Sequence, residues 1–182
     1  IAITLLSVMG LFFLYSASQG NINVVMKQAI FVGFGIFLMF ILSQPDPDIY
    51  KILSRVFLIT SLILVLITIL VAKEINGAKR WLDLGVFTLQ PSELVKIALP
   101  IYLAAYLFEK PIPIDLKNTF KSLLIIAVCF LLIARQPDLG TSLVVSMAGV
   151  YILFFAGLSW KFIGSSIIVF LISLPFLWNN FL

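Results

Sequence analysis

Apolar runs of about 17–25 residues recur along this chain, the length that a helix needs to cross a lipid bilayer. A bilayer offers no water to backbone N–H and C=O groups, so a crossing segment must satisfy its own hydrogen bonds as a helix. Only 11% of the residues are charged and 62% are hydrophobic, whereas roughly a quarter of a soluble domain is charged. The sequence therefore predicts an all-α fold, a polytopic bundle of transmembrane helices.

We expect seven spans in a single transmembrane domain that covers residues 1–182. Prolines mark several boundaries, because proline cannot continue a helix from the preceding turn. Two polar segments, residues 73–89 and 109–121, are predicted as loops. The chain starts and stops directly at apolar runs, so we expect it to be part of a larger protein. The spans are predicted at about residues 1–19, 27–43, 52–72, 91–108, 122–134, 137–156 and 160–178.

The loop charges indicate orientation only weakly, although cytoplasmic loops normally carry an excess of lysine and arginine. If the basic residues of 73–80 and Arg135 are retained for function, the remaining ones place the loop 109–121 in the cytoplasm. The loop 73–89 is then extracellular. Counting loops alternately, one side holds Lys51, Arg55, Lys110, Lys117, Lys121 and Lys161, and the other holds Lys27, Lys73, Lys79, Arg80 and Arg135.

Composition excludes several classes of function. The chain has no histidine, which rules out a histidine base or metal ligand. Its one cysteine, Cys129, cannot form an internal disulfide. The basic residues are scattered among short loops rather than gathered in a stripe, so the net charge of +4 does not indicate nucleic-acid binding.

The segment from Lys73 to Lys96 holds about a third of the chain's charged residues. Pro91 suits the first position of a helix, and Glu93 suits its first turn. Glu93 and Lys96 are three residues apart and so share one helix face. A structural ion pair at the mouth of the span is one interpretation. The other is function, because Lys96 lies more than a turn inside an apolar helix, where charge is costly.

A second helix start of the same design is Gln136-Pro137-Asp138, which Arg135 precedes. In the predicted topology it opens on the same face of the membrane as Gln90-Pro91-Ser92-Glu93. Two helix N-termini with Arg80 nearby would suit an anion such as a pyrophosphate. Capping of the sixth span is the simpler interpretation of Asp138, and an interfacial anchor is the simpler one of Trp81.

These segments also carry a family resemblance. The stretches GAKRWLDLG (77–85), QPSELVKIALP (90–100) and ARQPDLGTSLVV (134–145), with the turn at 157–160, resemble the shape, elongation, division and sporulation (SEDS) family, and most of all its members that act in cell elongation. The likeness covers essentially the whole chain. The family has about ten spans of bilayer length, so the resemblance implies an N-terminal part, inactive by itself because the aspartate usually assigned as catalytic would lie in the missing half.

The resemblance implies a peptidoglycan glycosyltransferase that polymerises lipid II on the outer face of the bacterial cytoplasmic membrane, together with a class B penicillin-binding protein that cross-links the strands. Carried over by motif, the positions that match the polar lining of an outward-facing cavity are Arg80, Gln90, Glu93, Lys96 and Asp138.

The resemblance assigns roles to these residues. Lys96 would keep the missing aspartate ionised as the base for the acceptor hydroxyl, with Glu93 in support. Arg80 would hold the donor pyrophosphate with the two helix starts. Asp138 would bind a divalent cation (Mg²⁺ or Mn²⁺) or orient the acceptor, and both interpretations stay open; no metal ligand is assigned. The remaining substrate-binding candidates are Trp81, Gln90, Gln136 and Arg135.

The alternative from another class is a flippase, a transporter of the lipid-linked precursor. A flippase needs a polar path to the inner face as well, whereas a transferase needs polar groups only at the outer face. Glu93, Lys96 and Asp138 all fall near the outer ends of their spans, which favours the transferase. A purely structural scaffold would leave these charges without a reason.

Overall fold

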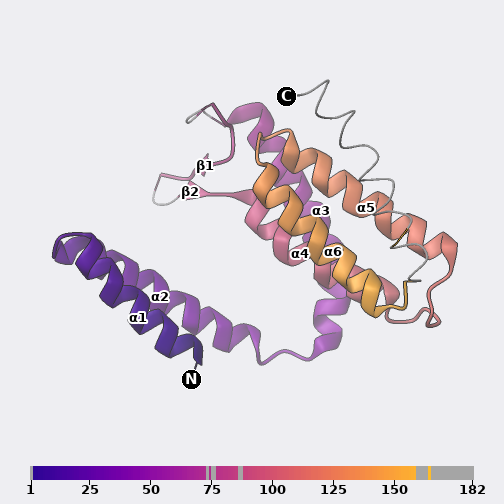
Figure 1. Cartoon of the computed structure of the whole chain (residues 1–182), viewed down its shortest axis with the longest axis horizontal. Helices are drawn as coiled ribbons and strands as arrows, with labels where there is room; N and C mark the ends of the chain where they lie inside the picture. Colours follow the sequence, from indigo (N-terminus) through magenta and orange to yellow (C-terminus); the bar gives the residue numbers. More distant parts are fainter. Residues whose placement is uncertain (1, 73, 75–76, 86–87, 159–163, 165–182) are drawn as a thin grey trace. The chain divides into compact units, whose positions relative to one another are not determined.

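The structure is a computed structural model that describes residues 2–72, 74, 77–85, 88–158 and 164. It divides into two compact units, Ile1–Pro47 and Asp48–Leu182, which we describe separately. The described residues form six helices and one small β-hairpin (Figure 1). The predicted seventh span, residues 160–178, lies outside the described residues apart from position 164. The count of seven spans therefore stays a prediction.

The first unit is a hairpin of two helices, α1 (Ala2–Ala17) and α2 (Ile22–Leu42). Gln19 and Gly20 form its turn with positive φ angles of 53° and 80°, and Asn21 caps α2 by accepting a hydrogen bond from the Asn23 amide at 3.1 Å. No described residue of either helix is buried. The two helices therefore present apolar side chains outward all round, as a bilayer allows.

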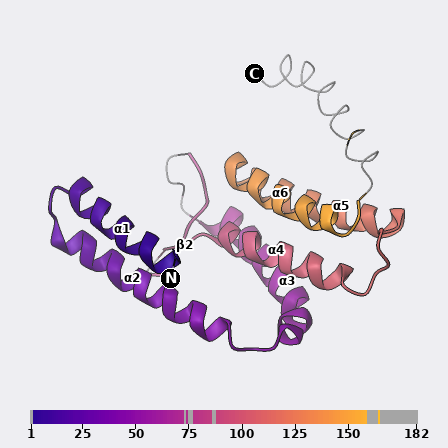
Figure 2. The ribbon, with the colours of Figure 1, turned by 60° about the horizontal axis from the view of Figure 1, so that its bottom comes forward.

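The second unit is an up-and-down arrangement of four helices, α3 (Pro47–Val71), α4 (Pro91–Leu107), α5 (Leu116–Ala134) and α6 (Leu139–Phe155). Figures 1 and 2 show α4 and α6 side by side, with α5 next to α6. At one end, the first turn of α3 meets the segment after α4, where Lys51 Nζ lies 2.7 Å from Glu109 Oε1. The Lys51 ammonium lowers the pKa of the Glu109 carboxyl, first by hydrogen bonding and then by charge.

The start of α5 lies at that same end, because the Tyr106 hydroxyl near the end of α4 donates to Asn118 Oδ1 at 2.7 Å. The end of α6 joins them through a hydrogen bond from the Ile114 amide to the Ala156 carbonyl at 3.3 Å. The other end therefore holds the C-termini of α3 and α5 and the N-termini of α4 and α6. We call it the hairpin end, since the β-hairpin leads into α4 there.

The interior of the four-helix unit is lined by small side chains, as is common where helices pack in a membrane. On α3 the buried positions are Ser54, Leu58, Ser61, Val65 and Thr68, which follow the alternating spacing of three and four that keeps side chains on one face. The three hydroxyls each donate to a carbonyl of their own helix at 2.7 Å. The helices therefore bury these hydroxyls without leaving them unpaired.

Gly149 brings α6 close to its neighbours. A Cβ atom at this position would lie 2.7 Å from Cγ1 and 2.9 Å from Cδ1 of Ile126, and 3.4 Å from Cδ1 of Leu103. Glycine thus permits the close approach of α6 to both α5 and α4. Around it lies a buried cluster drawn from all four helices, which includes Leu58, Val95, Leu99, Leu103, Ile126, Ile133, Val145 and Leu153.

Three predicted boundaries are corrected by the structure, all in the same direction. The second helix starts at Ile22 rather than at 27, the third at Pro47 rather than at 52, and the fifth at Leu116 rather than at 122. The segment predicted as the loop 109–121 is therefore helical from Leu116 onward. In α3 and α5 the added residues include charged ones, because a charged turn can lie where the apolar core of the membrane ends, whereas those added to α2 are mostly apolar.

The predicted loop 73–89 contains a short antiparallel hairpin that sequence patterning did not indicate. Strands β1 (Leu82–Asp83) and β2 (Thr88–Leu89) pair Leu82 with Leu89 and Asp83 with Thr88. The Gly85 amide donates to Asp83 Oδ1 at 2.9 Å, and Gly85 has a positive φ of 81°. The hairpin gives the chain a defined entry into α4.

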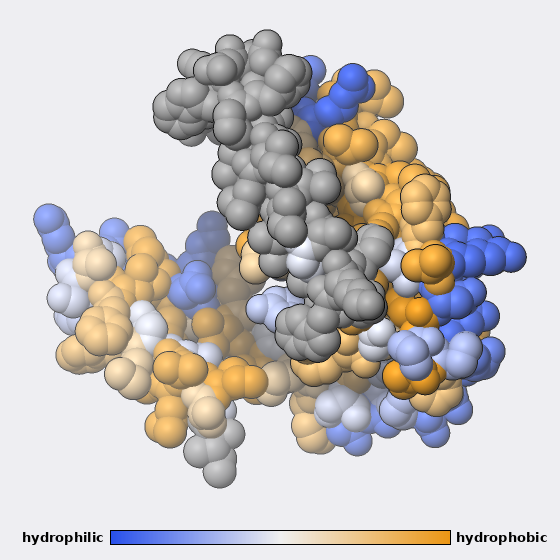
Figure 3. Space-filling view, turned by 45° about the vertical axis from the view of Figure 1, so that its right-hand side comes forward, coloured by the Kyte–Doolittle hydropathy of each residue, from blue (hydrophilic) through white to orange (hydrophobic). Residues whose placement is uncertain are grey.

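The surface matches a membrane environment. Of the described helices, α2, α3 and α5 are long and apolar enough to cross a membrane, and α1 and α6 are shorter apolar helices. On the face drawn in Figure 3, apolar residues cover most of the helices and the most hydrophilic residues gather at the margins. The chain is therefore a polytopic α-helical membrane protein, as predicted.

Candidate functional site at the hairpin end

The N-termini of α4 and α6 are joined directly by a side-chain hydrogen bond. Gln90 is the N-cap residue of α4 and Asp138 is that of α6. Gln90 Nε2 donates to Asp138 Oδ2 at 3.1 Å and to the Ser92 hydroxyl at 3.0 Å. The predicted convergence of two helix starts is therefore present in the structure. Both helix dipoles point their positive ends at the same place.

Asp138 also caps its own helix. Its Oδ1 accepts a hydrogen bond from the Thr141 amide at 3.1 Å, and the residue is 8% exposed. Both carboxylate oxygens thus have a protein partner. This arrangement supplies the capping role that the sequence suggested, and it leaves the carboxylate at the junction of the two helices.

Arg80 binds the backbone between α5 and α6. Its Nε donates to the Gln136 carbonyl at 3.1 Å, and its Nη2 donates to the Pro137 carbonyl. These carbonyls follow the C-terminus of α5, which carries partial negative charge and favours a cation. Two of the five guanidinium N–H groups are used in this way. These two hydrogen bonds therefore fix Arg80 beside the start of α6, although Arg80 lies in a loop.

Glu93 and Lys96 form the ion pair that their spacing predicts. Lys96 Nζ lies 2.7 Å from Glu93 Oε1, and the two side chains are 35% and 52% exposed respectively. A pair this open to its surroundings adds little stability by itself. Both side chains are thus accessible near the N-terminus of α4, three and six residues after Gln90.

Gln136 and Arg135 have opposite environments. Gln136 is 1% exposed, and its Nε2 donates to the Val65 carbonyl of α3 at 3.5 Å, while its Oε1 has no hydrogen-bond partner among the described residues. This burial favours a packing role for Gln136 over contact with a substrate. Arg135 is the C-cap residue of α5 and is exposed. The structure places it next in sequence to the carbonyls that Arg80 holds.

Trp81 follows Arg80 in sequence but lines a different part of the surface from the other candidates. It is 41% exposed and lines a hollow of about 600 Å³ with Glu74, Leu82 and Asp83 among its neighbours. None of Gln90, Glu93, Lys96 or Asp138 lines this hollow. The structure therefore brings together Arg80, Gln90 and Asp138. Glu93 and Lys96 follow within the first two turns of α4, and Trp81 lies just before β1.

Within the described ranges, no group of three or more histidine, cysteine, aspartate or glutamate side chains could hold a metal ion. The oxygens of Asp138 already accept two hydrogen bonds. The sequence also did not single out Ser92 and Thr141, which complete the contacts of Gln90 and Asp138. Their positions two or three residues after each cap were the available signal, since capping partners lie there.

The fold and this end of the bundle define a class of protein: an integral membrane protein with a polar site where two helices begin. Comparison with known proteins narrows the class. The chain matches the family model FTSW_RODA_SPOVE, described as "Cell cycle protein", over residues 1–180. The chain belongs to this family, which is the SEDS family that the motifs resemble.

Named relatives agree with this assignment. The chain is 36% identical over 165 residues to peptidoglycan glycosyltransferase MrdB of Escherichia coli K12, covering 91% of this chain and 45% of the relative. It is 32% identical over 155 residues to the probable peptidoglycan glycosyltransferase FtsW of Aliivibrio salmonicida, covering 81% and 39%. The chain thus spans about half the length, or less, of the curated relatives it matches.

Two solved structures share the fold. One belongs to a peptidoglycan synthase complex described for its coordination of polymerization and crosslinking; the TM-score is 0.89 at 28% identity, covering 99% of this chain and 53% of the other. The second is the rod shape determining protein RodA of Thermus thermophilus, with a TM-score of 0.81 at 30% identity and coverage of 96% and 56%.

Proposed function

We propose that the full-length protein is a peptidoglycan glycosyltransferase that polymerises lipid II into glycan strands during cell elongation. The observation that carries the proposal is the direct contact between the N-caps of α4 and α6, with Arg80 fixed beside it. Two converging positive helix ends and a guanidinium suit the pyrophosphate of a lipid-linked donor. Relatives of this chain are named peptidoglycan glycosyltransferases.

In this proposal each residue of the site acts on the substrate through its own chemistry. Arg80 keeps unused N–H donors for the pyrophosphate, which leaves as part of an undecaprenyl diphosphate. The catalytic carboxylate is the aspartate that the family resemblance places outside this chain. Lys96 of α4 holds that carboxylate in its ionised form, so that it removes the proton of the acceptor hydroxyl. Glu93 positions Lys96 through the 2.7 Å contact. Asp138 orients the Gln90 amide.

The alternative of a flippase has less support. The buried positions of α4 beyond Val95 are Ala98, Leu99, Leu103 and Leu107, and those of α6 beyond Ser142 are Val145, Gly149 and Leu153. These side chains offer no polar group to a headgroup that would pass between the two helices. A transferase needs no such path.

The proposal includes a partner and a location. We propose that the protein works with a class B penicillin-binding protein at the bacterial cytoplasmic membrane, with the hairpin end outside. The similarity to a peptidoglycan synthase complex that couples polymerization to crosslinking is the support for the partner. A divalent cation, if used, would be held mainly by the substrate phosphates, since carboxylates on the described chain do not cluster.

The test is glycan polymerisation from labelled lipid II by the purified full-length protein with its transpeptidase partner. Lys96→Ala is expected to abolish polymer, a loss of at least about a hundredfold for a group that tunes a catalytic base. Partner binding and melting temperature should hold, because the Glu93–Lys96 pair is open to its surroundings. Lys110→Ala, at the opposite end of the unit, is the matched control and should polymerise normally.

Normal polymer from Lys96→Ala would contradict the site assignment while leaving the transferase intact. No polymer from the wild type, with lipid II moving across vesicle membranes, would replace the transferase with the flippase.

A further inference from the structure

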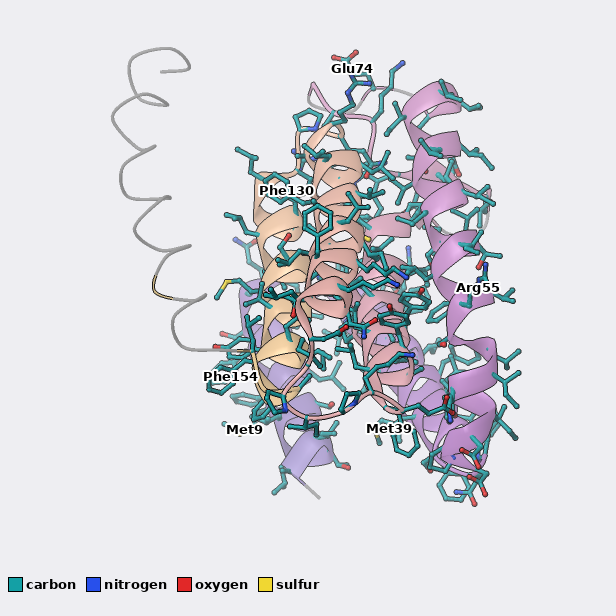
Figure 4. All side chains as sticks on the ribbon, turned by 90° about the vertical axis from the view of Figure 1, so that its right-hand side faces the viewer. Met9, Met39, Arg55, Glu74, Phe130 and Phe154 are labelled. Atoms are coloured by element: carbon teal, nitrogen blue, oxygen red, sulfur yellow. The ribbon has the colours of Figure 1, made fainter. Side chains whose placement is uncertain are left out.

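A groove lies on the side of the four-helix unit, away from the hairpin end. It has a volume of about 260 Å³ and runs between α3 and α5, with Tyr102 of α4 contributing to its lining. Figure 4 views these helices from the side and labels Arg55 on α3. The apolar lining residues are Leu58, Ile59 and Leu62 from α3, and Leu124, Ile125 and Val128 from α5.

The two helices are parallel and contribute the same pattern. On each helix the apolar lining residues occupy positions i, i+1 and i+4, starting at Leu58 on α3 and at Leu124 on α5. Three residues before each start, which is one turn of helix, stands a basic residue: Arg55 on α3 and Lys121 on α5. The groove is thus apolar along its length, with Arg55 in its lining and Lys121 on α5 one turn before the first α5 lining residue.

Within the part of the chain that the structure describes, these two cations have no partner, in contrast to Lys51 and Lys110. Among the residues that the structure describes, Lys51 contacts Glu109 at 2.7 Å and Lys110 lies over the ring of Tyr106 at 5.7 Å. Neither Arg55 nor Lys121 forms a hydrogen bond or ion pair with the described chain, and both are exposed. Arg55 itself lines the groove. Cations next to an apolar groove on membrane-spanning helices suit a ligand that joins an anionic group to a hydrocarbon chain.

We propose that this groove binds an anionic phospholipid, with the headgroup phosphate between Arg55 and Lys121 and an acyl chain along the apolar residues of α3 and α5. The lipid differs from the substrate of the hairpin end, because Arg55 precedes the end of α3 by sixteen residues, roughly 24 Å along the helix. A phosphate bound at Arg55 therefore cannot contact Arg80. If the hairpin end is outside, the bound lipid belongs to the inner leaflet.

The test uses full-length protein in detergent with phosphatidylglycerol that carries a photoreactive diazirine in its acyl chain. Crosslinked peptides are mapped by mass spectrometry, and the same probe with a phosphatidylcholine headgroup measures the preference for negative charge. We expect crosslinks on 58–62 and 124–128, with the anionic probe favoured. Arg55→Gln and Lys121→Gln should each reduce this preference about fivefold, the equivalent of about 1 kcal/mol per basic residue near a membrane surface.

Two variants separate the groove from general surface charge. Lys110→Gln removes a cation from the same end outside the groove and should leave crosslinking unchanged. Ile59→Trp with Ile125→Trp fills the groove, keeps both cations and should abolish crosslinking at 58–62 and 124–128. A melting temperature measured for every variant confirms that each one is folded.

Equal labelling by both headgroups, or wild-type labelling in the Arg55→Gln and Lys121→Gln double variant, would overturn the proposal. So would an absence of crosslinks in the wild type, which would mean that another part of the full-length chain occupies the groove. Displacement of the probe by undecaprenyl diphosphate but not by unlabelled phosphatidylglycerol would also overturn it, in favour of a second site for the isoprenoid lipid.

Discussion

At the scale of single residues, Asp138 shows how one side chain can have a structural and a chemical role. Its Oδ1 caps α6 and its Oδ2 accepts from Gln90. A cap requires only a hydrogen-bond acceptor, which asparagine supplies about as well as aspartate. The negative charge is a separate property. The two roles can therefore be separated by substitution.

For Asp138→Asn we expect a melting temperature close to the wild type, because the cap is retained. Asp138→Ala should lower the free energy of unfolding by about 1 kcal/mol through loss of the cap. Both variants should lose polymerisation from lipid II if the carboxylate serves the reaction. Wild-type polymerisation by Asp138→Asn, with normal stability, would reduce Asp138 to a helix cap.

The sequence predicted the location of these residues better than their contacts. Alternation of spans placed Gln90 and Asp138 on one face of the membrane, and the structure joins them. The sequence could not indicate that Arg80 binds main-chain carbonyls, because every residue type offers the same backbone acceptor. For the same reason, residue type could not indicate that Gln136 is buried and donates to the Val65 carbonyl of α3.

At the scale of elements, the apolar runs predicted each described helix and misplaced several starts. The error is systematic, since Lys27, Lys51, Lys117 and Lys121 were assigned to loops or to the ends of spans, yet all lie within helices. A long basic side chain can extend toward the headgroups while its backbone stays helical. Hydropathy therefore indicates the apolar part of a helix rather than its full length.

Packing within the bundle rests on small residues, and Gly149 gives a direct test. Gly149→Ala should lower the free energy of unfolding by about 1–3 kcal/mol, because its methyl group would overlap Ile126. The measurement is thermal unfolding of the purified protein in a fixed detergent. Gly33→Ala on α2, where no atom lies within 4 Å of the added Cβ, is the control and should not destabilise.

A second substitution identifies the cause of this effect. Ile126→Ala removes the atoms that the new methyl group would overlap, so combining it with Gly149→Ala should cost less than the sum of the two single changes. Additive losses would show that steric overlap with Ile126 is not the reason that position 149 is glycine.

At the scale of the whole molecule, orientation in the membrane decides whether the site can act on an extracellular substrate. Lys51, Arg55, Lys110, Lys117 and Lys121 all belong to the end of the four-helix unit opposite the hairpin. If the basic residues at the hairpin end are retained for function, the positive-inside rule predicts that this opposite end is cytoplasmic. The polar site at the hairpin end would then face outward, as a polymerase of exported lipid II requires.

This orientation can be measured with single cysteines in a Cys129→Ser background. Leu84, in the hairpin, is 53% exposed and Leu116, at the start of α5, is 81% exposed. A membrane-impermeant maleimide should label Leu84→Cys in intact spheroplasts and Leu116→Cys only after lysis. The reverse pattern would place the site in the cytoplasm and exclude the proposed polymerase.

The way in which Arg80 is held has a consequence for how the family varies. Its partners are the main-chain carbonyls of Gln136 and Pro137, which any residue at those positions would provide. The bond between Gln90 and Asp138, by contrast, joins two side chains and depends on both identities. In an alignment of relatives, positions 90 and 138 should therefore covary, whereas position 80 should change, or stay fixed, independently of 136 and 137.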